Sequence, residues 1–163
     1  MWYYVAMDSN VDRARTDAFA FLTKHKTGVL ATVSAQGESR SRLIYYVCDD
    51  NFTIYFSTLS STRKFLDFAV HPQASFTVAT EDVPQTLQIE GVVSEVTEEQ
   101  RIERWLAPLV DVLMSNKLFY WPVLKLSQGE VKLMQLKPTW IRWADYAFAE
   151  AGTSIYKEIL VKE

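Results

Sequence analysis

Residues 28–58 read GVLATVSAQGESRSRLIYYVCDDNFTIYFST, and this stretch decides the fold. It contains three segments rich in β-branched and aromatic residues, at 28–34, 39–48 and 52–58. Gly37 lies in the first turn between them, and Asp49-Asp50-Asn51 forms the second. Short turns of this kind join antiparallel neighbours. The stretch therefore predicts two successive hairpins, the second pairing 39–48 with 52–58.

Further strands and a few helices are predicted on either side of this stretch. Apolar residues recur at helical spacing over 10–25. Ser60-Ser61-Thr62 is expected to cap a short helix that ends before Pro72. Other strands are predicted at 73–80, 86–96, 131–136 and 139–144, with one more near 155–161. Six to eight short strands with two or three helices predict a small antiparallel barrel of the α+β class, mainly β.

Composition narrows the class of protein. The 163 residues carry a formal net charge of -3, with 48% hydrophobic and 23% charged side chains, which predicts a globular chain of one domain. The mild acidity argues against a nucleic-acid partner, and no apolar run is long enough for a transmembrane helix. One cysteine, Cys48, and two histidines give no basis for a disulfide or a zinc site. We expect a cytoplasmic protein with no bound metal.

The boundaries follow from where the periodic pattern begins and ends. We expect residues 1–9 to be a flexible N-terminal leader and 10–145 to be the folded domain. Residues 146–163 form a C-terminal extension whose structure the pattern does not define.

Polar groups interrupt the apolar pattern between Arg42 and Lys64. Arg42 lies on a predicted strand, and Ser57-Thr58 ends the next strand. The following helix opens with Arg63-Lys64, although the helix dipole favours acidic side chains in a first turn. Backbone N–H groups at a helix start, together with hydroxyls and cations, make a phosphate site. The plainer interpretation, a capped helix with solvated cations, stays open at this point.

A resemblance to a known family rests on seven segments that occur in order and at suitable gaps. They are Gly28–Val33, Gly37, Ser41–Tyr46, Ile54–Thr58, Thr62–Lys64, His71–Ser75 and Leu87–Gly91. Over about residues 20 to 97 the chain resembles the pyridoxamine 5′-phosphate oxidase-like family of FMN-binding proteins. The resemblance implies a six-stranded antiparallel split β-barrel with flanking helices. It also implies a homodimer with the flavin between the subunits.

The resemblance also assigns cofactor-binding residues. They are Arg42, Leu43, Ile44, Tyr45, Tyr46, Ser57, Thr58, Arg63, Lys64, Thr86 and Gln88. Arg42, Arg63 and Lys64 would bind the phosphate, and Ser57 and Thr58 the ribityl chain and ring. Thr86 stands where relatives often have a glutamine, which is a departure, and Gln88 lies nearby.

Two further departures concern the reaction. Val47 stands where true pyridoxamine phosphate oxidases have a lysine, and the Arg-x-His pair near their C-terminus has no counterpart here. Pyridoxamine phosphate oxidase activity is therefore not expected. We expect an FMN-dependent oxidoreductase that passes hydride from a reduced nicotinamide-type donor through flavin to a small acceptor, and no side chain is assigned a catalytic role. Alternatives left open are a non-catalytic flavin-binding or stress-response protein and a relative that binds deazaflavin or haem.

Overall fold

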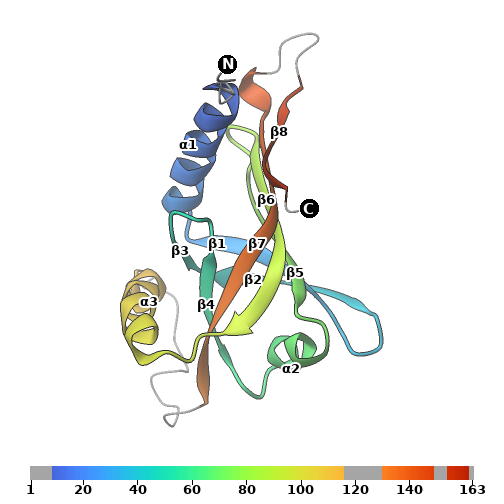
Figure 1. Cartoon of the computed structure of the whole chain (residues 1–163), viewed down its shortest axis with the longest axis vertical. Helices are drawn as coiled ribbons and strands as arrows, with labels where there is room; N and C mark the ends of the chain where they lie inside the picture. Colours follow the sequence, from blue (N-terminus) through green and yellow to red (C-terminus); the bar gives the residue numbers. More distant parts are fainter. Residues whose placement is uncertain (1–8, 116–129, 149–153, 162–163) are drawn as a thin grey trace, which may run out of the picture.

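The computed structural model describes residues 9–115, 130–148 and 154–161. Helices and strands alternate along the chain (Figure 1) in the order α1 (Ser9–Lys24), β1 (Thr27–Val33), β2 (Ser39–Tyr45), β3 (Val47–Cys48), β4 (Ile54–Leu59), α2 (Arg63–Val70), β5 (Gln73–Thr80), β6 (Gln85–Glu95), α3 (Glu99–Met114), β7 (Val131–Asp145), the 3-10 turn η2 (Tyr146–Phe148) and β8 (Tyr156–Val161). Helix α1 begins at Ser9, and residues 1–8 of the expected leader lie outside the described residues.

All strands join one curled antiparallel sheet in the order β2-β1-β5-β6-β7-β4-β3, and β8 pairs with β7. The expected α+β, mainly β split barrel is confirmed. The expected number of strands is not confirmed, because the described residues form a sheet of eight strands rather than six. The additional strands are the two-residue β3 and the C-terminal β8, which places a strand inside the expected extension 146–163.

Strand β7 corrects the prediction of two closing strands at 131–136 and 139–144. It is a single strand of 15 residues that pairs with β6 and β8, and also with β4. Proline has no N–H to give to a sheet, which is why Pro138 suggested a break. The sheet accommodates Pro138 opposite Gly91, where the register shifts between Glu90 and Gly91.

The second predicted hairpin is also wrong in its pairing. Strand β2 pairs along its whole length with β1, so Arg42 lies opposite Leu30 rather than beside residues 52–58. Only β3 forms a hairpin with β4, pairing Val47 with Tyr55 and Cys48 with Ile54. Local turn signals identified the strands. The predicted strand 39–48, however, is interrupted after Tyr45, so that β2 pairs with β1 and only β3 pairs with β4.

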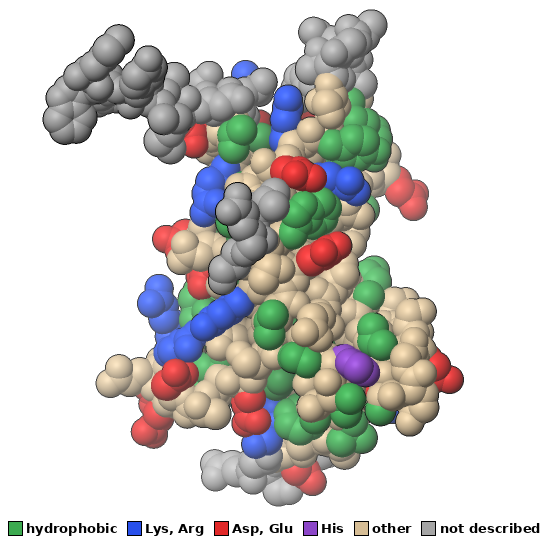
Figure 2. Space-filling view, turned by 45° about the vertical axis from the view of Figure 1, so that its right-hand side comes forward, with side chains coloured by type: hydrophobic (Ala, Val, Ile, Leu, Met, Phe, Trp, Pro, Cys, Tyr) green, Lys and Arg blue, Asp and Glu red, His purple; other side chains and the backbone are tan. Residues whose placement is uncertain are grey.

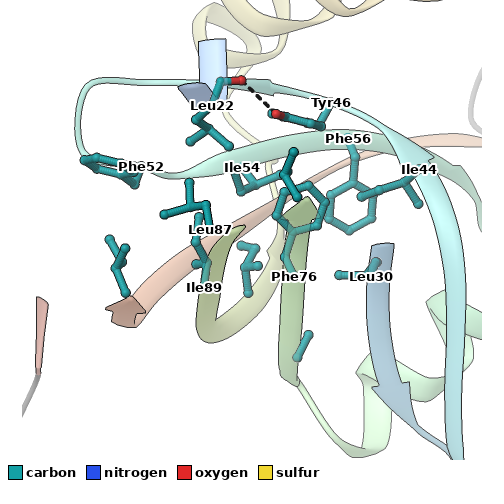
Figure 3. Close-up of a cluster of buried hydrophobic side chains, with 14 of the residues drawn as sticks. Leu22, Leu30, Ile44, Tyr46, Phe52, Ile54, Phe56, Phe76, Leu87 and Ile89 are labelled. Atoms are coloured by element: carbon teal, nitrogen blue, oxygen red, sulfur yellow. Dashed lines mark hydrogen bonds between the residues drawn. The ribbon is translucent and has the colours of Figure 1, made fainter. Parts of the chain in front are cut away.

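The main core lies inside the curl of the sheet and beneath α1. Figure 3 shows its largest side chains, which come from α1 and from strands on both sides of the barrel: Leu22, Leu30, Ile44, Tyr46, Phe52, Ile54, Phe56, Phe76, Leu87 and Ile89. Tyr46 is almost completely buried, and its hydroxyl donates a hydrogen bond to the Leu22 carbonyl oxygen at 2.7 Å. That bond satisfies the phenol inside the core and ties α1 to the strand region around Tyr46.

The two other helices lie on opposite sides of the lower part of the sheet (Figure 1). Helix α3 packs a second apolar cluster that includes Tyr55, Leu109 and Leu113. It continues through Pro108 as one helix. Helix α2 contacts β1 and β4. Among the described helices, none combines the length and the apolar character that a membrane span needs.

Candidate functional site

The start of α2 presents backbone N–H groups that its own cap leaves available. Thr62 occupies the N-cap position with extended backbone angles, yet its side chain makes no capping hydrogen bond. Its hydroxyl instead lies 2.8 Å from the Thr58 hydroxyl and donates to the Leu59 carbonyl oxygen at 2.8 Å. The first turn of the helix contains no acidic residue and begins with Arg63 and Lys64. A helix start with this composition favours an anion.

Four cations influence one another at this end of the molecule. Burial lowers the pKa of Lys64, and the positive charge of Arg42 lowers it further. Burial also lowers the pKa of Arg42, Asp67 opposes that shift, and Arg40 and Arg63 reinforce it. Partly desolvated cations that repel one another gain from a bound anion, because its opposite charge reduces that repulsion.

A cavity of about 520 Å³ opens beside this cationic group. Strand β2 supplies one side, β4 and the start of α2 another, and α3 and β7 the remainder. Its lining residues are Leu43, Ile44, Tyr45, Ser57, Thr58, Leu59, Thr62, Lys64, Leu113 and Val131. The volume is within the range of small-molecule sites, and the lining combines apolar walls with a few polar groups. Most of the residues expected along the flavin therefore meet at one place.

Tyr46 does not join them. Its side chain is in the main core, where its ring packs edge-on against Phe76 at 5.0 Å. Its backbone N–H donates to the Lys26 carbonyl oxygen. Tyr46 lies just beyond the end of β2, where its side chain enters the main core together with that of Ile44.

Thr86 and Gln88 also lie away from the cavity within this chain. They sit on β6 opposite Ala144 and Arg142 of β7, whereas the cavity lies where Thr58 pairs with Lys132. Ten residues of β7 separate the two places, roughly 33 Å along the strand at about 3.3 Å per residue. A single chain thus divides the expected flavin residues into two separate groups.

Two polar networks contain residues that the sequence analysis did not identify. Near Gln88, the Arg142 guanidinium donates from Nε at 3.0 Å and from Nη2 at 2.5 Å to the Gln88 side-chain oxygen, and it stacks on the Trp140 and Tyr156 rings. Near Arg42, the carboxylate of Asp67 is buried in α2. No signal in the sequence distinguishes Asp67 from a solvated helix residue.

The outer surface of the sheet around β1 is unusually apolar for an exposed face. Val29, Val33, Leu43 and Val92 are exposed there, and a groove of about 490 Å³ runs across β1, β5 and β6. Figure 2 brings forward the side on which β5 and α2 lie, and it shows hydrophobic side chains spread over the lower part with few charges between them. Exposed apolar patches of this kind mark contact surfaces.

Comparison with known proteins gives both a family and a fold. Residues 15–143 match the family model described as pyridoxamine 5′-phosphate oxidase. No curated protein matches the chain.

Three solved structures illustrate the range of proteins with this fold. An FMN-binding protein related to pyridoxamine 5′-phosphate oxidase from Nostoc punctiforme PCC 73102 has 13% identity and a TM-score of 0.55, with 96% of this chain and 90% of that chain covered. An F420 reductase has 20% identity and a TM-score of 0.61, covering 75% and 93%. A heme binding protein from Mycobacterium smegmatis has 17% identity and a TM-score of 0.63, covering 94% and 60%. At these identities the likeness shows the fold alone.

Proposed function

This chain belongs to the pyridoxamine 5′-phosphate oxidase family, and from that premise we propose that it is an FMN-binding flavoprotein with an oxidoreductase activity. The observation that carries the proposal is the group of cations formed by Arg63 and Lys64 at the start of α2 and by Arg42 on β2, with Lys64 lining a cavity of about 520 Å³. FMN combines a phosphate with a flat, largely apolar ring, and the site offers a matching surface for each part.

The phosphate group of FMN matches the cations and N–H donors at the start of α2. A phosphate needs cations and N–H donors, and the start of α2 offers both without a competing acidic side chain in its first turn. Lys64 lines the cavity itself. Its pKa is lowered first by burial and then by the charge of Arg42, so a bound anion would favour its charged form.

The remainder of the cavity fits the ribityl chain and the ring. Ser57 and Thr58 would face the ribityl hydroxyls, and the Leu43–Tyr45 segment with Leu113 would flank the ring. Bound FMN supplies reversible acceptance of hydride, so the task of this chain is to bind, orient and shield it. We propose a reduced nicotinamide-type donor and a small acceptor as the substrates.

We further propose a homodimer in which two chains complete each site. Thr86 and Gln88 are too far along β7 from the cavity to reach the same flavin within one chain, but a second copy can bring its own pair there. The exposed Val29, Val33 and Val92 supply an apolar surface that a second copy would cover.

The proposed dimer is tested by Val33→Glu, which places a charge on the outer face of β1. Val83→Glu is the matched control, because Val83 is similarly exposed but lies in the turn before β6. Light scattering over a dilution series should show a smaller particle for Val33→Glu only. A wild-type protein that holds FMN as a monomer would contradict the shared site.

Proteins of the same fold suggest two alternative cofactors, a deazaflavin and haem. A deazaflavin would fit the same cavity, since it also joins a flat ring to a phosphate-bearing chain. Haem is less suited, because an axial ligand is required and neither His25 nor His71 lines this cavity. A non-catalytic flavin-binding protein, with a role in stress, would use the same site without turnover.

The deciding experiment is an absorption spectrum of the purified protein after incubation with FMN and washing, in parallel with F420 and hemin. Retained flavin bands that bleach with a reduced nicotinamide support the oxidoreductase proposal. Retained bands without bleaching by any donor favour the non-catalytic alternative. Retention of F420 or hemin in place of FMN would refute FMN as the cofactor.

A further inference from the structure

Asp67 is the one buried acidic side chain among the described residues, with 3% of its surface exposed. It lies in the second half of α2, one helical turn after Arg63, and faces the sheet. Its Oδ2 accepts a hydrogen bond from the Thr32 hydroxyl at 2.9 Å, and its Oδ1 accepts one from Arg40 Nη1 at 2.9 Å. A buried carboxylate is costly unless it is paired and hydrogen-bonded in this way.

The same network holds Arg42. Its Nη1 donates to the Thr32 hydroxyl oxygen at 2.9 Å, and its Nη2 lies 3.7 Å from Asp67 Oδ2. Thr32 is itself buried, so its hydroxyl is a fixed link between the carboxylate and the guanidinium. Nη1 of Arg42 is thereby held by Thr32, and Nη2 faces the carboxylate of Asp67. The network joins β1 and β2 to the helix whose start carries Arg63 and Lys64.

Asp67 has two opposite effects on an anion bound nearby. Its negative charge weakens attraction, while its contacts fix the direction of Arg42. Arg40 lies 2.9 Å from the Asp67 carboxylate and also contacts Glu38 at 3.2 Å, so two acids share this cation. Arg42 lies 3.7 Å from Asp67, and the charge of Asp67 opposes the lowering of the Arg42 pKa by burial. Asp67 therefore offsets part of the charge of Arg42 and, through Thr32, also fixes its direction; we expect the second effect to decide the binding of a phosphate.

We propose that Asp67 is a positioning residue that, together with Thr32, aims the guanidinium of Arg42 at the phosphate of the bound cofactor. The inference rests on the proposed function and adds a residue to its site. It predicts that the preference for a phosphorylated flavin depends on a buried acid, although an acid repels phosphate in direct contact. Riboflavin, which has no phosphate, should bind independently of Asp67.

The test compares FMN and riboflavin by fluorescence titration against wild-type protein, Asp67→Asn and Glu38→Gln. Both variants remove one negative charge beside Arg40, but only Asp67 contacts the Arg42 network. For Asp67→Asn we expect FMN affinity to fall about tenfold or more, the effect of one charge-assisted hydrogen bond, with riboflavin affinity unchanged. Glu38→Gln should leave the FMN-to-riboflavin ratio unchanged or raise it slightly.

An Asp67→Asn protein with an unchanged or higher FMN-to-riboflavin ratio would overturn the inference and leave the proposed function intact. Wild-type protein that binds FMN no better than riboflavin would overturn both. If Asp67→Asn does not fold, Thr32→Val replaces it, because valine keeps the shape and removes the hydroxyl link. Thr32→Val should weaken FMN but not riboflavin, and equal effects on both ligands would refute the inference.

Discussion

Gly91 lies opposite Pro138 at the register shift between β6 and β7, and replacing it with alanine should destabilise the sheet. A Cβ at this position would lie 2.1 Å from the Lys137 carbonyl oxygen and 2.8 Å from its carbon. Both are backbone atoms, so no side chain can turn away to relieve the contact. Overpacking of this kind costs about 3 kcal/mol, and the lower freedom of the unfolded alanine chain returns about 0.5 to 1 kcal/mol. The expected net loss is about 2 kcal/mol.

Urea unfolding followed by far-UV circular dichroism measures this loss. With a slope of about 2 kcal/mol per molar urea, the midpoint should fall by about 1 M. Gly37→Ala is the control, because Gly37 has a φ of +83° but nothing within 4 Å of its Cβ position. Left-handed strain alone should cost that variant about 1 kcal/mol or less. All samples need one protein concentration, since dimerisation adds to stability. A Gly91→Ala midpoint equal to that of Gly37→Ala would refute the reasoning.

Three further predictions concern the cations at the start of α2 and the single cysteine. Replacing both Arg63 and Lys64 with alanine should weaken FMN about 100-fold or more in a fluorescence titration, because two charge-assisted contacts are lost, and unchanged affinity would refute the phosphate site. Burial and the charge of Arg42 lower the pKa of Lys64, so FMN affinity should be highest below that pKa and should fall as the pH rises through it, at a lower pH than for an ordinary lysine. Lys64→Arg should abolish this fall, because arginine stays charged. A pH profile of Lys64→Arg identical to that of the wild type would contradict the assignment to Lys64. Burial, with the charge of Asp49, raises the pKa of Cys48 to about 12, so its thiolate fraction at pH 8 is about one in ten thousand and a thiol reagent should react quickly only after unfolding.

Much of the fold could be predicted because its signals are local. Alternation identified β5 and β6, and the residue before Pro72 marked the end of α2. The errors concern pairing between distant segments. Pro138 suggested a break in β7 because its tolerance depends on Gly91, a residue far away in the chain. The assignment of residues 39–48 to one strand was wrong for a similar reason, since β2 pairs with β1 whereas β3 pairs with β4.

The candidate site shows the same division. Arg42, Ser57 and Lys64 form a recognisable pattern in sequence because cations and hydroxyls cluster around a helix start. Asp67 has no such pattern, since its importance comes from burial against Thr32, which only the packing of α2 on β1 creates. The distance along β7 between the cavity and the pair Thr86 and Gln88 likewise becomes visible only once the register of the sheet is known.

The pairing of β4 with β7 also constrains when the site can form in a living cell. Thr58 pairs with Lys132, and Val131 closes the cavity, so part of its wall is translated long after the helix start that would hold the phosphate. Nascent chains emerge from the ribosome N-terminal end first. The edges of β4 and β6 that await β7 are therefore exposed to unwanted partners during synthesis. A cofactor can enter a complete site only after β7 has been translated and has paired with β4.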